Sequence, residues 1–244
     1  MTLREQLAHT AAILAIALIA WLSPLQGWDD AVTGFYFDVQ EHTFPLRNTW
    51  LFETLLHDVA KQLPVLVALA LVAGLLRSVR VPSRRWQQRP LGCALLTLVI
   101  GTVICGLLKD TMPMACPWSL AQFGGSRPHY TLSMLLSGQV PAHAPASHCW
   151  PSGHAAGAFG LLGLYFAARA TQRPEATWLL PAILVFGALL GWAQVARGAH
   201  FPSHVLWSLV ICWTVALALG SLLGRAPQRP VPVQREIRRH GGRT

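Results

Sequence analysis

Charged residues are scarce in this sequence. They make up 12% of its 244 residues, while 53% are apolar, whereas a soluble domain carries about 25% charge. This shortfall argues strongly against a soluble globular protein. It also excludes a disordered or fibrous chain, because a disordered chain combines low hydrophobicity with high charge. Internal repeats are absent, and the low-complexity tract is confined to the Pro/Arg-rich end, so we expect one domain.

Long apolar runs dominate the sequence instead. A bilayer core about 30 Å thick needs roughly 20 helical residues, with a range of about 17–25. The third and sixth runs meet this length alone, whereas the others need polar ends or shielding by neighbouring helices. We therefore predict an all-α membrane protein, with six transmembrane helices in a bundle over residues 1–224. The runs are 11–22, 63–76, 91–108, 155–168, 178–193 and 205–224.

The first run follows Arg4, as in a signal peptide, but no small-x-small cleavage site comes after it. We therefore expect a retained membrane anchor.

Positive charge is distributed unevenly along this topology. The formal net charge is +9, and 14 of the 19 basic residues lie in segments 1–10, 77–89, 169–175 and 225–244, which share one predicted face. Basic residues accumulate in cytoplasmic loops. We therefore expect a bacterial inner-membrane protein with both termini, including a basic tail at 225–244, in the cytoplasm. The charge indicates membrane orientation and not nucleic-acid binding.

The five cysteines fall into two groups. Cys93, Cys105 and Cys212 lie in apolar runs and are expected to be small core residues. Cys116 and Cys149 lie in the second outer segment, where a disulfide is chemically allowed if that side is periplasmic. It would close a loop of about 30 residues and stabilise the fold by roughly 3–4 kcal/mol. Two unpaired thiols are the alternative, and the sequence leaves both open.

Ionisable residues cluster at three places on the face opposite the basic one. These are Lys109 at the end of the third run, residues 151–154 before the fourth, and 197–204 between the fifth and sixth. Ser152 and Gly153, just before a helix, offer a hydroxyl and backbone N–H groups to an anion. The histidines offer a nucleophile and a general acid near neutral pH. This combination predicts phosphoryl transfer, in which the protein mainly positions the phosphate and stabilises its charge.

At these three places the sequence resembles the type 2 phosphatidic-acid phosphatase superfamily, which includes six-span membrane lipid phosphatases. The family pattern is Lys-x6-Arg-Pro, then Pro-Ser-Gly-His, then Ser-Arg-x5-His-x3-Asp. Residues 151–154 match the second motif completely, and 198–203 match the core of the third. Lys109 and Pro117 match the first motif in spacing. The resemblance covers about positions 91–224.

The departures from the family pattern concern groups that would handle phosphate. Cys116 and Gln194 stand where the pattern has Arg, and His204 stands where it has Asp. Arg197 lies three residues after Gln194, so on a continuous helix it would share a face with that residue and reach the same phosphate. Arg127 is the candidate for the other missing guanidinium.

The resemblance implies a role for each matching residue. His200 would attack phosphorus and form a phosphohistidine, and His154 would protonate the leaving alkoxide. Lys109, Ser152 and the backbone of Gly153 would hold the phosphoryl oxygens.

His204 would take the orienting place beside His200. A neutral imidazole stabilises a developing cation less than a carboxylate does, so Asp110 and Asp58 are alternative sources of that charge. A rival interpretation takes His200 and His204 as a pair of metal ligands, with His154 as a third. Pro202 argues against regular helix between the pair, and no carboxylate completes the set nearby.

We therefore expect a lipid phosphatase that acts on a phosphate monoester or pyrophosphate at the periplasmic face, without metal or organic cofactor. By resemblance, the candidate substrates are phosphatidic acid, phosphatidylglycerol phosphate, undecaprenyl pyrophosphate and the phosphates of lipid A. A lipid-to-lipid phosphotransferase and a catalytically inactive lipid-binding relative remain open as alternatives. Among the other histidines, His129, His143 and His148 are expected to be solvated or to contact the headgroup. His57 is expected to cap a helix at the interface, with a place at the rim of the pocket as the alternative.

Overall fold

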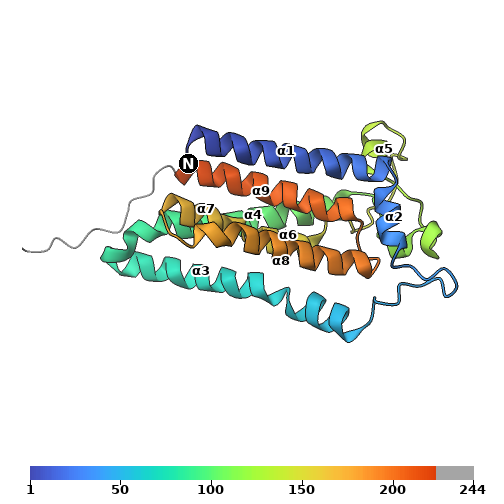
Figure 1. Cartoon of the computed structure of the whole chain (residues 1–244), viewed down its shortest axis with the longest axis horizontal. Coiled ribbons are helices and arrows are strands. Elements are labelled where there is room, and N and C mark those ends of the chain that lie inside the picture. Colours follow the sequence, from blue (N-terminus) through green and yellow to red (C-terminus); the bar gives the residue numbers. More distant parts are fainter. Residues whose placement is uncertain (224–244) are drawn as a thin grey trace, which may run out of the picture.

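The computed structural model describes residues 1–223, so the predicted basic tail at 225–244 lies outside the described residues. The described chain consists of helices joined by loops (Figure 1), which confirms the all-α prediction. The elements are α1 (Leu3–Leu25), α2 (Trp28–Gly34), the π-helix η1 (Trp50–Val59), α3 (Gln62–Arg80), η2 (Pro82–Gln87), α4 (Gln88–Thr111), η3 (Pro117–Ser119), η4 (Ala121–Phe123), α5 (Leu132–Leu136), α6 (Gly153–Phe159), α7 (Leu162–Ala170), α8 (Ala176–Ala196) and α9 (Pro202–Leu223).

Within the described residues, five helical segments are long and apolar enough to cross a membrane. The predicted count of six is not confirmed, because the fourth apolar run forms two short helices, α6 and α7. Gly160 stands at the break. A Cβ there would lie 2.6 Å from Leu98 Cδ1, so α4 approaches the chain closely at this point. The five segments are Leu3–Leu25, Trp50–Arg80, Pro82–Thr111, Ala176–Ala196 and Pro202–Leu223.

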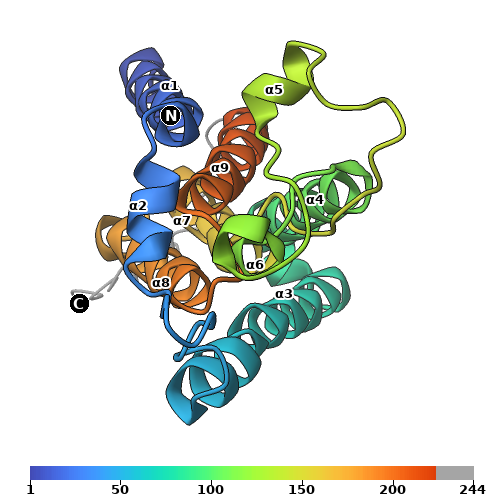
Figure 2. The same ribbon diagram turned by 90° about the vertical axis from the view of Figure 1, so that its right-hand side faces the viewer.

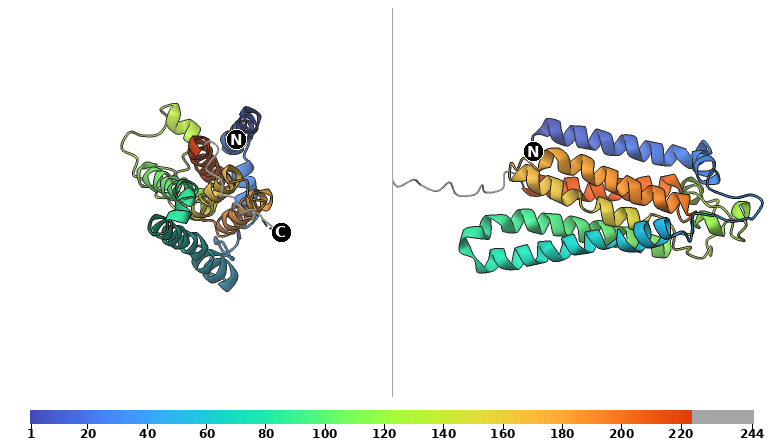
Figure 3. Two further views of the ribbon diagram at one scale, coloured as in Figure 1. Left: turned by 90° about the vertical axis from the view of Figure 1, so that its left-hand side faces the viewer. Right: turned by 60° about the horizontal axis from the view of Figure 1, so that its bottom comes forward.

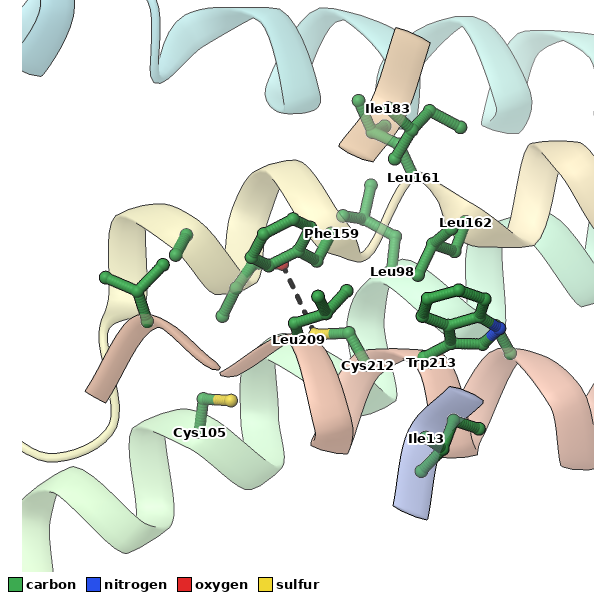
Figure 4. Close-up of a cluster of buried hydrophobic side chains, with 14 of the residues drawn as sticks. Ile13, Leu98, Cys105, Phe159, Leu161, Leu162, Ile183, Leu209, Cys212 and Trp213 are labelled. Atoms are coloured by element: carbon green, nitrogen blue, oxygen red, sulfur yellow. Dashed lines mark hydrogen bonds between the residues drawn. The ribbon is translucent and has the colours of Figure 1, made fainter. Parts of the chain in front are cut away.

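The short helices α6 and α7 lie at the centre of the bundle. They pack against α4, α8 and α9, while α1 packs on α9 and α3 on α4, as the views in Figure 3 show. Their apolar side chains interlock with those of α9 in one core cluster, drawn in Figure 4, which includes Phe159, Leu162, Leu209 and Trp213. Cys212 belongs to this cluster and donates its S–H to the Ala156 carbonyl oxygen at 3.5 Å.

The bundle has two different ends. At one end, α4 and α8 finish, α6 and α9 begin, and the loops 26–49 and 112–152 lie across them (Figures 1 and 2). We call this the loop end. The other end carries the start of α1 and the tight connections from α3 to α4 and from α7 to α8, and we call it the arginine end. Its arginines are Arg4, Arg77, Arg80, Arg84, Arg85, Arg89, Arg169 and Arg173.

Candidate active site

The predicted site residues lie on different elements that meet at the loop end. Lys109 is in the last turn of α4, and Ser152 precedes α6, which begins at Gly153. A Cβ built on Gly153 would lie 3.9 Å from Lys109 Nζ, so the ammonium group lies beside the start of α6. His200 stands in the short link between α8 and α9. The helix packing therefore brings the three sequence clusters together.

Direct hydrogen bonds join the starts of α6 and α9. The backbone N–H of Ser152 donates to the carbonyl oxygen of His204 at 3.2 Å. The hydroxyl of Ser208 donates to the carbonyl oxygen of Ser152 at 2.9 Å. The Ser152 hydroxyl is itself buried and has no hydrogen-bond partner among the described residues. It is thus free to donate to a phosphoryl oxygen, as the sequence predicts.

The link between α8 and α9 turns sharply to present His200. Gly198 has a φ of +70°, and a Cβ there would lie 2.4 Å from Phe44 Cδ2, so only glycine fits this position. Its carbonyl oxygen accepts the N–H of Trp118 at 2.9 Å, and the His200 N–H donates to the Gln194 carbonyl oxygen at 3.3 Å. These contacts fix the link between the end of α8 and the outer loop.

His200 and His204 are both buried, with exposed fractions of 4% each, and their ring centroids are 5.8 Å apart. Burial lowers the pKa of His200 well below its ordinary value, and the neighbouring His204 and Lys109 act in the same direction. The imidazole of His200 therefore stays neutral at physiological pH, as a nucleophile requires. Nδ1 of His204 is buried without a hydrogen-bond partner among the described residues.

A disulfide joins Cys116 to Cys149, with Cα atoms 5.2 Å apart. Cys149 Sγ lies 3.6 Å from Nδ1 of His200. The bridge therefore holds the segment before α6 against the loop after α4, directly beside one nitrogen of the histidine. Because Nδ1 faces the sulfur, Nε2 is the nitrogen of His200 left for chemistry.

His57 belongs to this site and is not merely an interfacial cap. Its ring centroid lies 4.0 Å from that of His154, and its Nδ1 is 2.7 Å from Nη1 of Arg197. The only sequence signal for this was its position before the second apolar run on the same face. Nε2 of His154 is buried without a partner among the described residues.

Arg197 is buried, with an exposed fraction of 6%. Its Nε donates to the Arg47 carbonyl oxygen at 2.8 Å, and its Nη1 lies 3.5 Å from Oε1 of Gln194. Gln194 is buried too, and its Nε2 has no partner among the described residues. The guanidinium thus lies beside the His57–His154 pair, and the Gln194 amide offers a further unpaired donor.

Other predicted groups lie outside this buried set. Arg127 is exposed and donates to the Ser147 hydroxyl at 2.8 Å, within the outer loops. Asp110 lies 3.1 Å from Nδ1 of His148, and Asp58 pairs with Lys61 at 2.7 Å. Each of these carboxylates therefore has a different partner from the one proposed for it, since neither contacts His200.

The potential metal ligands that lie together differ from the expected set, because Cys149 takes the place of His154. Ligand atoms of Cys149, His200 and His204 lie within 4.8 Å of one another. The disulfide, however, ties up the sulfur, and a thiolate is the form of cysteine that binds metal. Two histidines are then left, so this group is a poor fit for a zinc ion.

A groove of about 520 Å³ beside the site is lined by residues of α3, α4 and α6 and by Lys61, just before α3. Its polar end contains Lys61, Lys109 and His154, and its apolar length includes Val65 and Leu98. The groove therefore has the polarity of a lipid phosphate, with a place for an anionic head and a wall for a hydrocarbon chain.

Comparison with known families gives one match. A family model described as the PAP2 superfamily matches residues 90–226. The comparisons with curated proteins and with solved structures gave no match.

Proposed function

Because that match covers more than half of its length, the chain belongs to the PAP2 superfamily, and we propose that it is a lipid phosphatase. It removes phosphate from a lipid phosphate monoester or pyrophosphate through a phosphohistidine on His200. The observation that carries this proposal is that Lys109 and His154 line the polar end of an otherwise apolar groove, with His200 buried close enough for both to lower its pKa. Ser152 stands directly before α6, beside the Lys109 ammonium group. The family implies phosphatase-type activity, and the groove favours a lipid substrate.

The proposed reaction has two steps. Nε2 of His200 attacks phosphorus, the bond from phosphorus to the leaving oxygen breaks, and His154 gives its proton to that oxygen. In the second step His154 accepts a proton from water, whose oxygen attacks phosphorus and displaces His200. Lys109 and the Ser152 hydroxyl stabilise the charge on the phosphoryl oxygens. No step requires a metal or an organic cofactor.

The buried donors beside the histidines compensate for the missing family arginines. Cys116 stands in the position of one of them, and its disulfide leaves it no group that can bind an anion. Gln194 stands in the position of the other and keeps a buried amide donor without a partner among the described residues. Arg197, three residues later, supplies the positive charge from beside His57.

We further propose that α6 and α7 together form the sixth membrane crossing. The break between them is enclosed by α4, α8 and α9, and non-helical backbone is tolerated at membrane depth where protein covers it. The arginine end then faces the cytoplasm of a bacterial inner membrane. The start of α1 and the end of α9 lie on that side, and the site opens to the periplasm.

The test is phosphate release by purified protein in detergent, with EDTA present, from the four candidate lipids. The wild type is compared with His200→Ala and with His143→Ala, a variant of an exposed histidine in the outer loop. We expect release that survives EDTA, falls by about 10³-fold or more in His200→Ala and is unchanged in His143→Ala. Equal release by the two variants would reject His200 as the nucleophile.

The two alternatives predict different results in the same assay. A phosphotransferase releases little phosphate alone, but it moves radiolabelled phosphate to an added acceptor lipid through the same histidine. An inactive lipid-binding relative gives neither result, although a folded preparation still binds the substrate. This alternative follows from the loss of both family arginines, in the first and third motifs.

A further inference from the structure

One buried carboxylate in the described residues plays no part in the mechanism above. Asp29 lies on α2, the short helix that crosses the loop end of the bundle (Figure 2). Its exposed fraction is only 1%, and a buried carboxylate is costly unless hydrogen bonds compensate for the lost water. Asp29 lies outside residues 90–226, so the family match assigns it no role.

Three hydrogen bonds to Asp29 provide that compensation. Oδ1 accepts the backbone N–H of Ser203 at 2.9 Å and the hydroxyl of Ser23 at 2.7 Å. Oδ2 accepts the hydroxyl of Ser203 at 2.5 Å. Burial raises the pKa of Asp29, and the bonds from Ser203 and Ser23 oppose that rise. Two of the three bonds therefore fall on a single residue of α9.

Ser203 is the second residue of α9, where backbone N–H groups have no partner within the helix. A carboxylate beside a helix N-terminus satisfies such a donor and interacts favourably with the helix dipole. Asp29 therefore does for α9 what an N-cap residue does, but from a segment more than 170 residues earlier in the chain.

Ser203 lies between His200 and His204, so a contact that fixes its backbone restricts the backbone positions from which both rings project. Asp29, Ser203 and His204 line the same cavity of about 20 Å³. The place where the family pattern has an aspartate is taken by His204, and the nearby Asp110 and Asp58 have other partners. No other carboxylate among the described residues has a hydrogen bond to residues 200–204.

We propose that Asp29 is the positioning residue of this active site: acting through Ser203, it holds the start of α9 so that His200 meets the phosphate bound by Lys109 and Ser152. The inference rests on the proposed function. Asp29 does not touch the substrate. It supplies from α2 the fixed anchor that the third motif no longer provides with its own carboxylate.

The test compares Asp29→Ala, Asp29→Asn and Ser203→Ala with a matched control, Asp30→Asn. Asp30 is the next residue and is partly exposed, and it accepts a hydrogen bond from the Gln122 side chain. We expect Asp29→Ala to lower kcat by about 10²-fold, since a small misplacement of a reacting group costs about that much. KM for the lipid should stay unchanged, because the groove lies on α3, α4 and α6.

The two variants that keep one of these hydrogen bonds should lose less kcat than Asp29→Ala. The amide oxygen of Asp29→Asn still accepts the Ser203 N–H, so we expect a loss of about tenfold or less. Ser203→Ala keeps that same backbone bond and should show a comparable loss. Asp30→Asn should match the wild type.

Two readouts separate positioning from simple destabilisation. Vanadate mimics the transition state and requires His200 in place, so its inhibition constant should rise in Asp29→Ala while that of phosphate does not. In the same variant, amide exchange should increase in peptides covering residues 198–206 and not across the bundle. The proposal would be overturned if the loss of kcat only matched the loss of folded protein, and if the protein that stayed folded were inhibited by vanadate as strongly as the wild type.

Failure of this proposal is distinguishable from failure of the proposed function. An inactive wild type rejects the phosphatase, while amide exchange at 198–206 still tests the anchor without turnover. Unchanged exchange there in Asp29→Ala rejects the anchor. An active wild type with unaffected Asp29 variants rejects the anchor and leaves the phosphatase standing.

Discussion

The two ends of the helical bundle hold their charged residues in opposite ways. At the loop end, Asp29 and Arg197 are buried and each makes several hydrogen bonds. At the arginine end, Arg77, Arg80 and Arg85 are exposed. A charged group that is buried away from water is stable only when hydrogen bonds or an opposite charge compensate for the lost hydration. The buried charges at the loop end therefore depend on a specific set of partners. Exposed charge at the other end needs no partner to orient the chain in a membrane.

A histidine at each end makes the same contrast testable, and we expect it to give the largest effect. The ring of His154 packs against that of His57 at the loop end, whereas His9 on α1 lies 3.2 Å from the Tyr165 hydroxyl. We expect His154→Ala to lower kcat by about 10²–10⁴-fold, the range for a lost general acid. His9→Ala should lower the unfolding temperature and leave kcat per folded molecule unchanged. Equal kcat losses would contradict the division of roles.

Removal of the disulfide should give the next largest effect. The Cys116–Cys149 bridge closes a loop with a sequence separation of 33, and loss of such a bridge costs about 2–5 kcal/mol of stability. Cys116→Ala combined with Cys149→Ala should lower the unfolding temperature and also reduce kcat, because Cys149 contacts His200. Cys93→Ala is the control, since this free thiol lies in α4. Thermal unfolding and phosphate release check both effects, and a double variant as active as Cys93→Ala would show that the bridge does not shape the site.

The arginines give a smaller contrast. Arg197→Ala removes buried hydrogen bonds from a charged group and should cost about 1.5–3 kcal/mol of stability, together with a loss of kcat/KM of about tenfold or more. Arg169 at the other end pairs with Glu5 on a partly exposed surface, where such pairs contribute about 0.2–1 kcal/mol. Arg169→Ala should therefore retain wild-type kcat/KM. Unchanged kcat and KM in Arg197→Ala would show that Arg197 does not bind the substrate phosphate.

The pH dependence should show the smallest effect. His200 has a lowered pKa because it is buried, so its nucleophilic form persists as the pH falls through 6.5, and we expect the acidic fall in kcat/KM only below that value. Unfolded His200 takes up a proton near pH 6.5 and folded His200 does not, so stability is highest above this pH and declines below it. Thermal unfolding between pH 5 and 8 should show this slope, which His200→Ala should reduce. An acidic limb centred above 6.5 would contradict the burial argument.

Local signals predicted the family and the helices well. Apolar runs predicted the all-α class, and three short motifs in order identified the family. Both signals depend on residues that are close together in the sequence. The count of crossings was harder. A continuous apolar run at 155–168 carried no sign that close packing of Gly160 against α4 would divide it.

Such local signals could not predict the contacts that His57 and Asp29 make at the loop end. Neither stands in a motif, and each meets its partners only after helices far apart in sequence pack side by side. Arg197 was named from its spacing, but its contacts to Arg47 and His57 depend on how the loop before η1 folds over α8.

The sequence by itself determined the membrane class, the family and the residues available for phosphate chemistry, because hydropathy and motif spacing are properties of neighbouring residues. Only the tertiary structure decided which groups face one another. It placed a disulfide beside His200, a histidine against His154 and a buried carboxylate at the start of α9. Burial and pairing depend on surfaces supplied by distant segments, and they arise only when the bundle closes.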